Sequence, residues 1–368
     1  MISLDQYFGY TSILGLLLPC CLPSLLSPLT AQTTAPKPPP WQTIVQWDND
    51  LLMTGTDQDY TNGARIAFQR EFPSEKLPRG TLKDPLRRIT GTEKNTSAAE
   101  IRFGRGKPLR YAWGVGLTQI MYTPTNPNAG KSPAGERPYA GWLGVEFSLQ
   151  AMNDQASTGI TLSLGTTGDA SLAEDTQDWV HENISNSPLF QGWNSQLEEE
   201  FTVNLHFDHK RRLHLLEHGM PGQWETDGYG EWGIAGGNFR TNSYLGGLIR
   251  FGYNLPPTYS IPRVQLGSYG AAFFREEARE RKAFSLLGFT GLRGSLVIHD
   301  ITLDGSVFPH SPSATESKIL VGEWLYGLQL RWNAFDLSLS NTLRTTEFKG
   351  QDKHHSFGSV MLRWRHRY

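Results

Sequence analysis

The chain has 368 residues, enough for one large all-β domain or for two smaller domains. Its formal net charge is −2, which excludes the basic surface that a nucleic-acid-binding protein needs. With 38 Gly, 11 Trp, 13 Tyr and 18 Phe, and few long apolar runs, the composition favours a β-barrel over a helical domain.

The N-terminal segment 1–31 is predicted to be an export signal. An apolar run from Ile13 to Leu29 ends at Leu29-Thr30-Ala31, a cleavage site with small residues, although no Lys or Arg precedes the run. The alternative is a disordered tail. Cys20 and Cys21 are the only cysteines and both lie in this segment, so the mature chain would hold no disulfide and no thiolate metal site. Residues 32–41 are predicted to be a polar linker before the barrel at 42–368.

Segments with two-residue alternation of polar and apolar side chains follow. They predict about twelve strands, an even number that is typical of a single-chain outer-membrane barrel. The predicted strands are 42–53, 60–71, 110–122, 139–152, 158–166, 199–211, 223–235, 242–253, 284–297, 318–332, 335–348 and 356–368.

The final strand gives the clearest signal. Val360, Leu362 and Trp364 share one face, whereas Arg363, Arg365 and Arg367 share the other. Arginines on one face indicate a polar lumen, with the apolar face toward lipid. A soluble β-sandwich also alternates, but it would not keep this pattern over twelve long strands. The sequence therefore predicts an all-β, up-and-down transmembrane barrel.

Three connections contain more than a turn. Residues 72–109 include a short predicted helix from Asp84 to Ile89, and residues 254–283 contain a charged run that predicts a solvated helical turn or arm. Residues 167–198 predict the main helix, with Ser171 to Glu174 as a capping box. Its apolar stripe comprises Leu172, Thr176, Trp179, Val180 and Ile184, and His181 falls on the polar side.

Strand parity brings distant residues to one rim of the barrel. Successive strands run in opposite directions, so the connections 54–59, 123–138 and 167–198, which follow the first, third and fifth strands, share a rim. If both termini are periplasmic, that rim is extracellular. The residues gathered there are Asp50, Tyr60, Thr61, Asn62, Lys131, Arg137 and His181.

The chemistry available at this rim is limited. No nucleophile elbow and no zinc-protease motif are present. An imidazole with its ordinary pKa of ~6.5 is a natural general base, which makes His181 the candidate. Asp48, Asp50, Asp57 and Asp59 offer hard oxygen ligands that suit Ca²⁺.

Each of these residues could instead have a purely structural role. His181 could be a surface histidine, the aspartates could belong to an ordinary turn, and Lys131 and Arg137 could cap a loop or bind a phosphorylated headgroup. Alternation places Asp48, Asp50 and Thr61 on the inward face, with Asn49 outward unless a bulge turns it.

Four motifs occur in the order of a known family. They are Asn49-Asp50 with Thr56 to Gly63, the R-P-Y-A-G-W of Arg137 to Trp142, the segment from Gly165 to His181, and the G-W-x-x-Q-L of Gly192 to Leu197. Together they resemble the outer-membrane lipid A 3′-O-deacylases.

The resemblance implies a twelve-stranded barrel that removes the ester-linked 3′ acyloxyacyl chain of lipid A with the help of Ca²⁺. It implies that His181 activates water, that Asn49, Asp50 and Thr61 complete the catalytic group, and that Asp50 binds the metal. Lys131, Arg137, Tyr60 and Asn62 would contact substrate. An acidic residue that the family can place six positions after the histidine is replaced here by Ser187.

Other functions remain open at this point: a non-catalytic pore or adhesin, an outer-membrane phospholipase with a serine nucleophile, and a soluble lipid-binding barrel. The favoured interpretation is a monomer in the Gram-negative outer membrane. Its partners would be lipid A or lipopolysaccharide and membrane lipid, and nucleic acid is not among them.

Overall fold

The computed structural model describes residues 39–50, 59–72, 83–90, 109–133, 135–153, 155–185, 187–213, 223–256, 258–259, 263–267, 284–308, 311–312 and 315–366. The predicted export signal (1–31) lies outside the described residues, as do 32–38 of the predicted linker. The barrel begins at Trp41, one residue before the predicted boundary.

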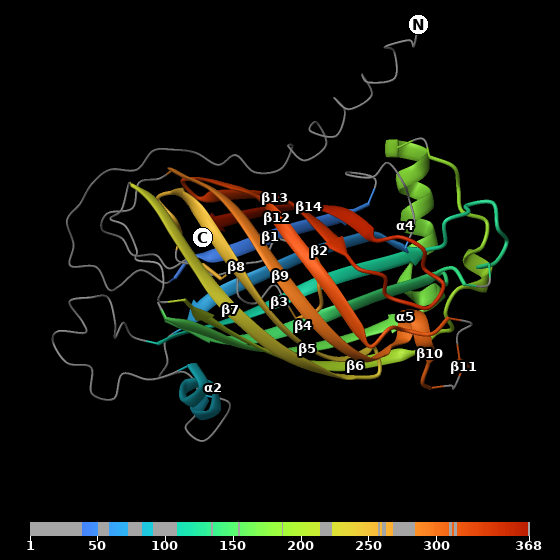
Figure 1. Ribbon diagram of the computed structural model, residues 1–368, viewed down its shortest axis with the longest axis horizontal. Helices are drawn as coiled ribbons and strands as arrows, with labels where there is room; N and C mark the ends of the chain where they lie inside the picture. Colours follow the sequence, from blue (N-terminus) through green and yellow to red (C-terminus); the bar gives the residue numbers. More distant parts are fainter. Residues whose placement is uncertain are drawn as a thin grey trace, which may run out of the picture.

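Twelve antiparallel strands close into a barrel, which confirms the predicted fold class (Figure 1). Each strand pairs with its neighbours in sequence, and β1 closes the wall against β14, with Trp41 opposite His366 and Asn49 opposite Gly358. The strands are β1 (Trp41–Asn49), β2 (Asp59–Phe72), β3 (Arg110–Thr123), β4 (Ala140–Met152), β5 (Ala156–Thr167), β6 (Phe201–Arg212), β7 (Trp224–Gly237), β8 (Arg240–Tyr253), β9 (Phe284–Asp300), β12 (Leu320–Trp332), β13 (Phe335–Arg344) and β14 (His355–His366).

The two ends of the barrel carry different elements. The helices α4 (Ala173–Val180) and α5 (Ile301–Asp304) lie at one end, with the small sheet of β10 (Gly305–Ser306) and β11 (Ser311–Pro312) (Figure 1). The helix α2 (Lys83–Thr90), close to the predicted 84–89, lies at the other end. We call these the α4 end and the α2 end. The connections after β1, β3 and β5 therefore share the α4 end, as strand parity predicted.

The wall has the polar-inside pattern that the sequence indicated. On β14, Ser359, Met361 and Arg363 are buried inside, and the Arg363 guanidinium lies 3.6 Å from the Asp336 carboxylate of β13. The opposite face of the wall exposes large apolar side chains on almost every strand, as expected where lipid is the surrounding solvent. Among the described residues, no helix combines the length and apolar character that a membrane crossing requires.

The lumen is filled rather than open. Buried ion pairs join strands that are next but one to each other along its inner face, among them Arg65 of β2 with Glu146 of β4 at 2.7 Å and Arg293 of β9 with Glu231 of β7 at 2.7 Å. The described part of the β8–β9 connection also folds into the lumen, with Tyr259 and Val264 buried. The prediction of a solvated helical turn or arm concerns the charged run of this connection. The charged run at 275–282 lies outside the described residues.

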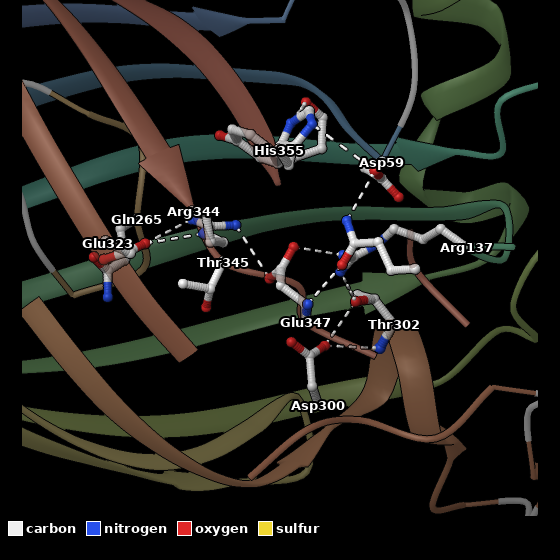
Figure 2. Close-up of polar contacts among 12 residues, drawn as sticks. Asp59, Arg137, Gln265, Asp300, Thr302, Glu323, Arg344, Thr345, Glu347 and His355 are labelled. Carbon is white, nitrogen blue, oxygen red and sulfur yellow. Dashed lines mark hydrogen bonds and ion pairs between the residues drawn. The ribbon is translucent and has the colours of Figure 1, made fainter. Parts of the chain in front are cut away.

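A polar cluster joins the connections at the α4 end, and we call Arg137, Thr302, Glu323, Arg344 and Glu347 the mouth network (Figure 2). Arg137 donates to the Glu347 carboxylate at 2.8 Å and to the Thr302 hydroxyl at 2.9 Å. Arg344 contacts Glu347 at 3.2 Å and Glu323 at 2.9 Å. Because these residues come from three connections and two strands, the network ties the mouth of the barrel together.

The Glu347 carboxyl has a strongly shifted pKa. Burial alone would raise it, but the positive charges of Arg344 and Arg137 outweigh burial and lower the pKa to about 2. A carboxyl whose pKa is lower in the folded state stabilises the fold at any pH above its unfolded pKa. That contribution is lost as the pH falls from about 4.5, the ordinary value, toward 2.

We therefore expect Glu347→Gln to lower the free energy of unfolding by about 3–5 kcal/mol at neutral pH, since it leaves two buried guanidinium groups short of a counter-charge. The difference from wild type should shrink as the pH falls below 4.5. Denaturant unfolding in detergent micelles across this pH range measures it. Glu316→Gln is the control, because the Glu316–Lys349 pair is exposed and should contribute under about 1 kcal/mol. A pH-independent difference would contradict the interpretation.

Candidate active site

The end of β1 presents consecutive residues to opposite sides of the wall. Asp48 faces the lumen, where its carboxylate accepts from the backbone N–H of Val264 at 2.8 Å. Asn49 follows on the outer face, which it shares with Trp47 because strand residues alternate. Asp50 ends the strand, fully buried, and its N–H lies 3.5 Å from the carbonyl oxygen of Thr61 on β2.

A β-bulge on β2 turns Thr61 away from the lumen. The pairing of β2 with β3 shifts between Tyr60 and Asn62, so Thr61 is an extra residue in the strand. Tyr60 points inward, whereas the Thr61 hydroxyl bonds that of Thr123 at 2.6 Å. Thr123 is on the outer face, because Tyr122 before it packs inside against Tyr60. The prediction of an inward Thr61 by simple alternation is therefore wrong.

Asn62 lies beside this group on the outer face. Its side-chain oxygen accepts from the Trp47 indole N–H at 3.0 Å, and it pairs with Asn49 across the hairpin. The outer side of the β1–β2 hairpin therefore gathers Asn49, Thr61 and Asn62, with Asp50 buried at its tip.

Helix α4 lies on the outer face of the wall, over β3 and β4. The 3-10 turn η3 (Asp169–Ser171) precedes it, and the Gln119 side chain of β3 donates to the carbonyl oxygens of Ser171 and Leu172 at 2.8 and 3.1 Å. The contact is close enough to require glycine at position 141 of β4, where a Cβ would come within 2.4 Å of the Ala173 Cβ. This segment is therefore packed directly onto the strand.

The start and the buried face of α4 both differ from the sequence prediction. The helix begins at Ala173 behind Leu172, which adopts a left-handed φ of 54° and makes no side-chain cap, so the predicted capping box is not formed. Ala173 and Gln177 are buried, and the predicted apolar stripe is exposed at Leu172, Trp179 and Ile184. In a soluble protein the apolar face of a helix packs against the protein core. At a membrane surface that face can point outward, toward lipid.

His181 lies on the buried side of this helix, in the π-helical turn η4 (His181–Ser185), and is only 5% exposed. The sequence had placed it on the polar, solvent-facing side. Its Nδ1 lies 2.8 Å from the carbonyl oxygen of Pro188. A carbonyl oxygen can only accept, so Nδ1 carries the proton and Nε2 carries the lone pair of the neutral imidazole.

An aromatic cluster connects His181 to the wall. Phe190 packs against the His181 ring at 6.0 Å between centroids and belongs to a buried cluster with Met121, Tyr139, Ala173 and Trp193. The Trp193 indole donates to the Gln177 side chain at 2.8 Å, one helical turn before His181 on the same buried face. Met121 lies two residues before Thr123, whose hydroxyl holds Thr61. His181, Asn49 and Thr61 therefore lie at the same end and on the same side of the wall, and Asp50 follows Asn49 at that end.

The charge next to His181 is acidic. Asp178 lies one turn earlier on α4, where burial raises the pKa of its carboxyl and a positive charge on His181 would lower it.

The residues predicted to contact substrate lie on both sides of the barrel wall. Lys131 is exposed in the β3–β4 connection, and Asn62 is on the outer face. Tyr60 and Arg137 point inward instead. The Tyr60 hydroxyl lies 3.1 Å from Asp48, and Arg137 belongs to the mouth network, with its guanidinium 4.0 Å from the centre of the Tyr122 ring. Their partners are protein side chains.

The aspartates proposed for Ca²⁺ are also separated. Asp48 is in the lumen, and Asp59 bonds Gln351 at 3.0 Å beside the mouth network (Figure 2). Asp57 lies outside the described residues. Within the part of the chain that the structure describes, no group of three His, Cys, Asp or Glu side chains could hold a metal ion.

Several residues that build this site were not singled out from the sequence. Trp193, Tyr139 and Gly141 support His181 and α4, and they occur in the G-W-x-x-Q-L and R-P-Y-A-G-W motifs. Those motifs were the available signal. Thr123 and Pro188 act through one hydrogen bond each, and no sequence pattern indicated either of them.

Comparison with known proteins agrees with this architecture. A family model described as outer membrane protein LpxR matches residues 16–366. The solved structure of LpxR from Salmonella typhimurium is similar with a TM-score of 0.65 and 15% sequence identity, over 88% of this chain and 99% of that chain. The β domain of the Bordetella autotransporter BrkA matches with a TM-score of 0.39 and 10% identity, over 89% of this chain and 98% of that chain. No curated protein sequence matches the chain.

The family match spans almost the whole chain and covers the hairpin, the β3–β4 connection and the α4 segment that form the site. The protein therefore belongs to the LpxR family of outer-membrane proteins, the family that its motifs resemble.

Proposed function

We propose that this protein is a hydrolase that removes the 3′-O-linked acyloxyacyl chain from lipid A in the outer leaflet. The observation that carries the proposal is the position of His181. It is a buried imidazole with its Nδ1 proton held by Pro188, on the outer side of the wall that carries Asn49 and Thr61, at the end of the barrel where Asp50 ends the described part of the hairpin. A lipid ester could reach this side from the membrane without entering the lumen.

In the proposed reaction, His181 Nε2 takes a proton from water as the water oxygen attacks the ester carbonyl carbon. The carbonyl oxygen becomes an oxyanion, and the Asn49 side-chain amide is the group on the outer face best suited to donate to it. The tetrahedral intermediate then breaks its bond to the sugar oxygen. The imidazolium returns its proton to that oxygen, which yields a lipid A hydroxyl and a free carboxylic acid.

The exposed face of α4 supports entry of substrate from the membrane. Leu172, Trp179 and Ile184 are each at least 40% exposed, and they lie on the helix that contains the base at its end. Lys131 is the exposed cation of the β3–β4 connection and would suit a phosphate of the headgroup. Arg137 does not suit this role, because its guanidinium is buried in the mouth network.

The filled lumen argues against the pore alternative. Two cavities, one near Tyr60 and His206 and one near Asp208, have volumes of only about 50 and about 20 Å³. The apolar outer face likewise argues against a soluble lipid-binding barrel.

Calcium dependence is part of the proposal. The Asp50 carboxylate and the Asn49 side-chain oxygen are hard donors of the type that Ca²⁺ prefers, and bound Ca²⁺ would polarise the ester carbonyl. Ca²⁺ takes about six to eight oxygens, and the described residues offer a single carboxylate here, so no step of the mechanism above depends on the ion.

We expect His181→Ala to lower the rate of deacylation on the order of 10²- to 10⁴-fold, as loss of a general base does. Mass spectrometry of lipid A from cells that make the variant should show the 3′ chain retained, whereas wild type should remove it. His354→Ala is the control, since His354 is an exposed histidine at the same end. Loss of the 3′ chain with His181→Ala would exclude this residue as the base.

We expect chelation to slow hydrolysis and added Ca²⁺ to restore the rate, because the bound ion would polarise the ester carbonyl. Binding can also be measured without catalysis, because a ligand at about 100 times its Kd stabilises the folded state by about 2.7 kcal/mol. Unfolding of wild type should therefore shift with Ca²⁺, and unfolding of Asp50→Asn should not. Equal shifts in both proteins would place the ion elsewhere.

We expect Trp179→Ala to raise KM by about 3- to 10-fold and to leave kcat unchanged. The apolar contact that it removes would stabilise the bound lipid substrate and the transition state equally. Assays with lipid A in mixed micelles give both constants. Trp232→Ala, an exposed tryptophan on β7, is the matched control and should change neither. A fall in kcat with unchanged KM would show that Trp179 supports His181 instead.

A further inference from the structure

The lumenal segment Arg263–Gly267 bonds to the inside of the same part of the wall that carries the catalytic group outside. Side chains of β1, β2 and β4 make five hydrogen bonds with its backbone. They are Gln46 to the Arg263 carbonyl oxygen at 3.3 Å, the Val264 N–H to Asp48 at 2.8 Å, Tyr60 to the Val264 carbonyl oxygen at 3.3 Å, Arg65 to the Gln265 carbonyl oxygen at 2.8 Å, and the Gly267 N–H to Glu146 at 2.7 Å.

Asp48 connects the lumenal segment to β1. Its Oδ2 receives the Val264 N–H and lies 3.1 Å from the Tyr60 hydroxyl, and the residue is fully buried. Asn49 is the next residue, on the opposite face. Because the wall is one strand thick, a fixed position for the Asp48 side chain also fixes the backbone from which Asn49 and Asp50 project.

Tyr60 transmits the contact to the bulge on β2. Its ring packs between Tyr122 at 5.5 Å and Phe357 at 4.7 Å, and its carbonyl oxygen accepts from His355 Nε2 at 3.2 Å. Position 63 must be glycine for this arrangement, because a Cβ there would come within 2.0 Å of the Tyr60 hydroxyl oxygen. Thr61 is the residue that the bulge turns outward, so the pose of Tyr60 determines the pose of Thr61.

We propose that the lumenal segment Arg263–Gly267 acts as an internal brace that positions Asn49, Asp50 and Thr61 for hydrolysis, through Asp48 and Tyr60. This inference rests on the proposed deacylase function. It assigns Asp48 and Tyr60 as positioning residues, which replaces the earlier expectation that Tyr60 contacts substrate. A connection that leaves the barrel at the α2 end thereby controls a site at the α4 end.

Three variants test the brace from different sides. Tyr60→Phe removes only the hydroxyl, Asp48→Asn removes the charged acceptor, and Gly267→Ala acts on the segment itself. At Gly267 the φ is +76° and a Cβ would lie 2.7 Å from the His206 Cβ, so the substitution must displace the segment. Asp336→Asn is the matched control, a buried lumenal aspartate of β13. Its partner Arg363 pairs with Ile44 of β1, four residues before Asp48 and toward the α2 end.

With lipid A as substrate, each of the three variants should lower kcat on the order of 10- to 100-fold, because small displacements of catalytic groups are costly in rate. KM should stay within about twofold, since no group that touches substrate has changed. The Tyr60→Phe/Asp48→Asn double variant should lose less than the product of the single effects, because both act on one contact. Asp336→Asn should keep the wild-type kcat.

Hydrogen exchange of the full chain in detergent gives a second readout that does not depend on activity. In the three variants, amides of residues 48–50 and 59–62 should exchange faster, and those of β7 and β8 should not change. Unchanged exchange at the hairpin, or an equal increase around the whole barrel, would overturn the brace. So would wild-type kcat in Tyr60→Phe and Asp48→Asn. If wild type itself does not hydrolyse lipid A, the proposed function fails, and the exchange result still decides whether the segment positions the hairpin.

Discussion

A barrel wall is one strand thick, and consecutive residues of a strand face opposite environments. The arrangement of the candidate active site depends on that constraint. Asp48 bonds the interior while Asn49 faces the exterior, and the two differ by one position along β1. The interior can therefore be built for rigidity and the exterior for chemistry, with the backbone of β1 and β2 shared between them. A single bulge at Thr61 is enough to move one hydroxyl from one side to the other.

The interior is built from charge. Arg65, Arg137 and Arg293 are nearly inaccessible to solvent, as are their carboxylate partners, and Arg344 is largely covered. Isolated charges in such surroundings would be unstable. Each is matched by an opposite charge, and the mouth network lets Glu347 serve two arginines. The segment Arg263–Gly267 adds backbone groups that satisfy the side chains of β1, β2 and β4. A lumen filled in this way leaves the outer face of the wall for the proposed reaction.

On the outer face of the wall, a histidine that faced lipid would be neither solvated nor held in one orientation. Helix α4 avoids this by packing onto Gly141 and Gln119, so that His181 is enclosed between helix and wall. The Pro188 carbonyl oxygen fixes the tautomer, and the Phe190, Tyr139 and Trp193 rings fix the position. The apolar side chains of α4 are then free to face the membrane. The helix thus shields the base and offers an apolar surface to a lipid.

The sequence by itself determined the twelve strands, nearly all of their boundaries, the polar lumen and the shared rim of the hairpin and α4. These features depend on two-residue alternation and strand parity, which are local or purely topological. Tertiary structure alone decided the outward turn of Thr61, the buried side of α4, the inward position of Arg137 and Tyr60, and the lumenal course of residues 263–267. Each of these depends on a partner distant in the chain: Thr123 for Thr61, Gly141 for α4, Glu347 for Arg137 and Asp48 for Val264. A periodic pattern records which face a residue takes in a regular element, but it does not record which neighbour interrupts that element or covers it.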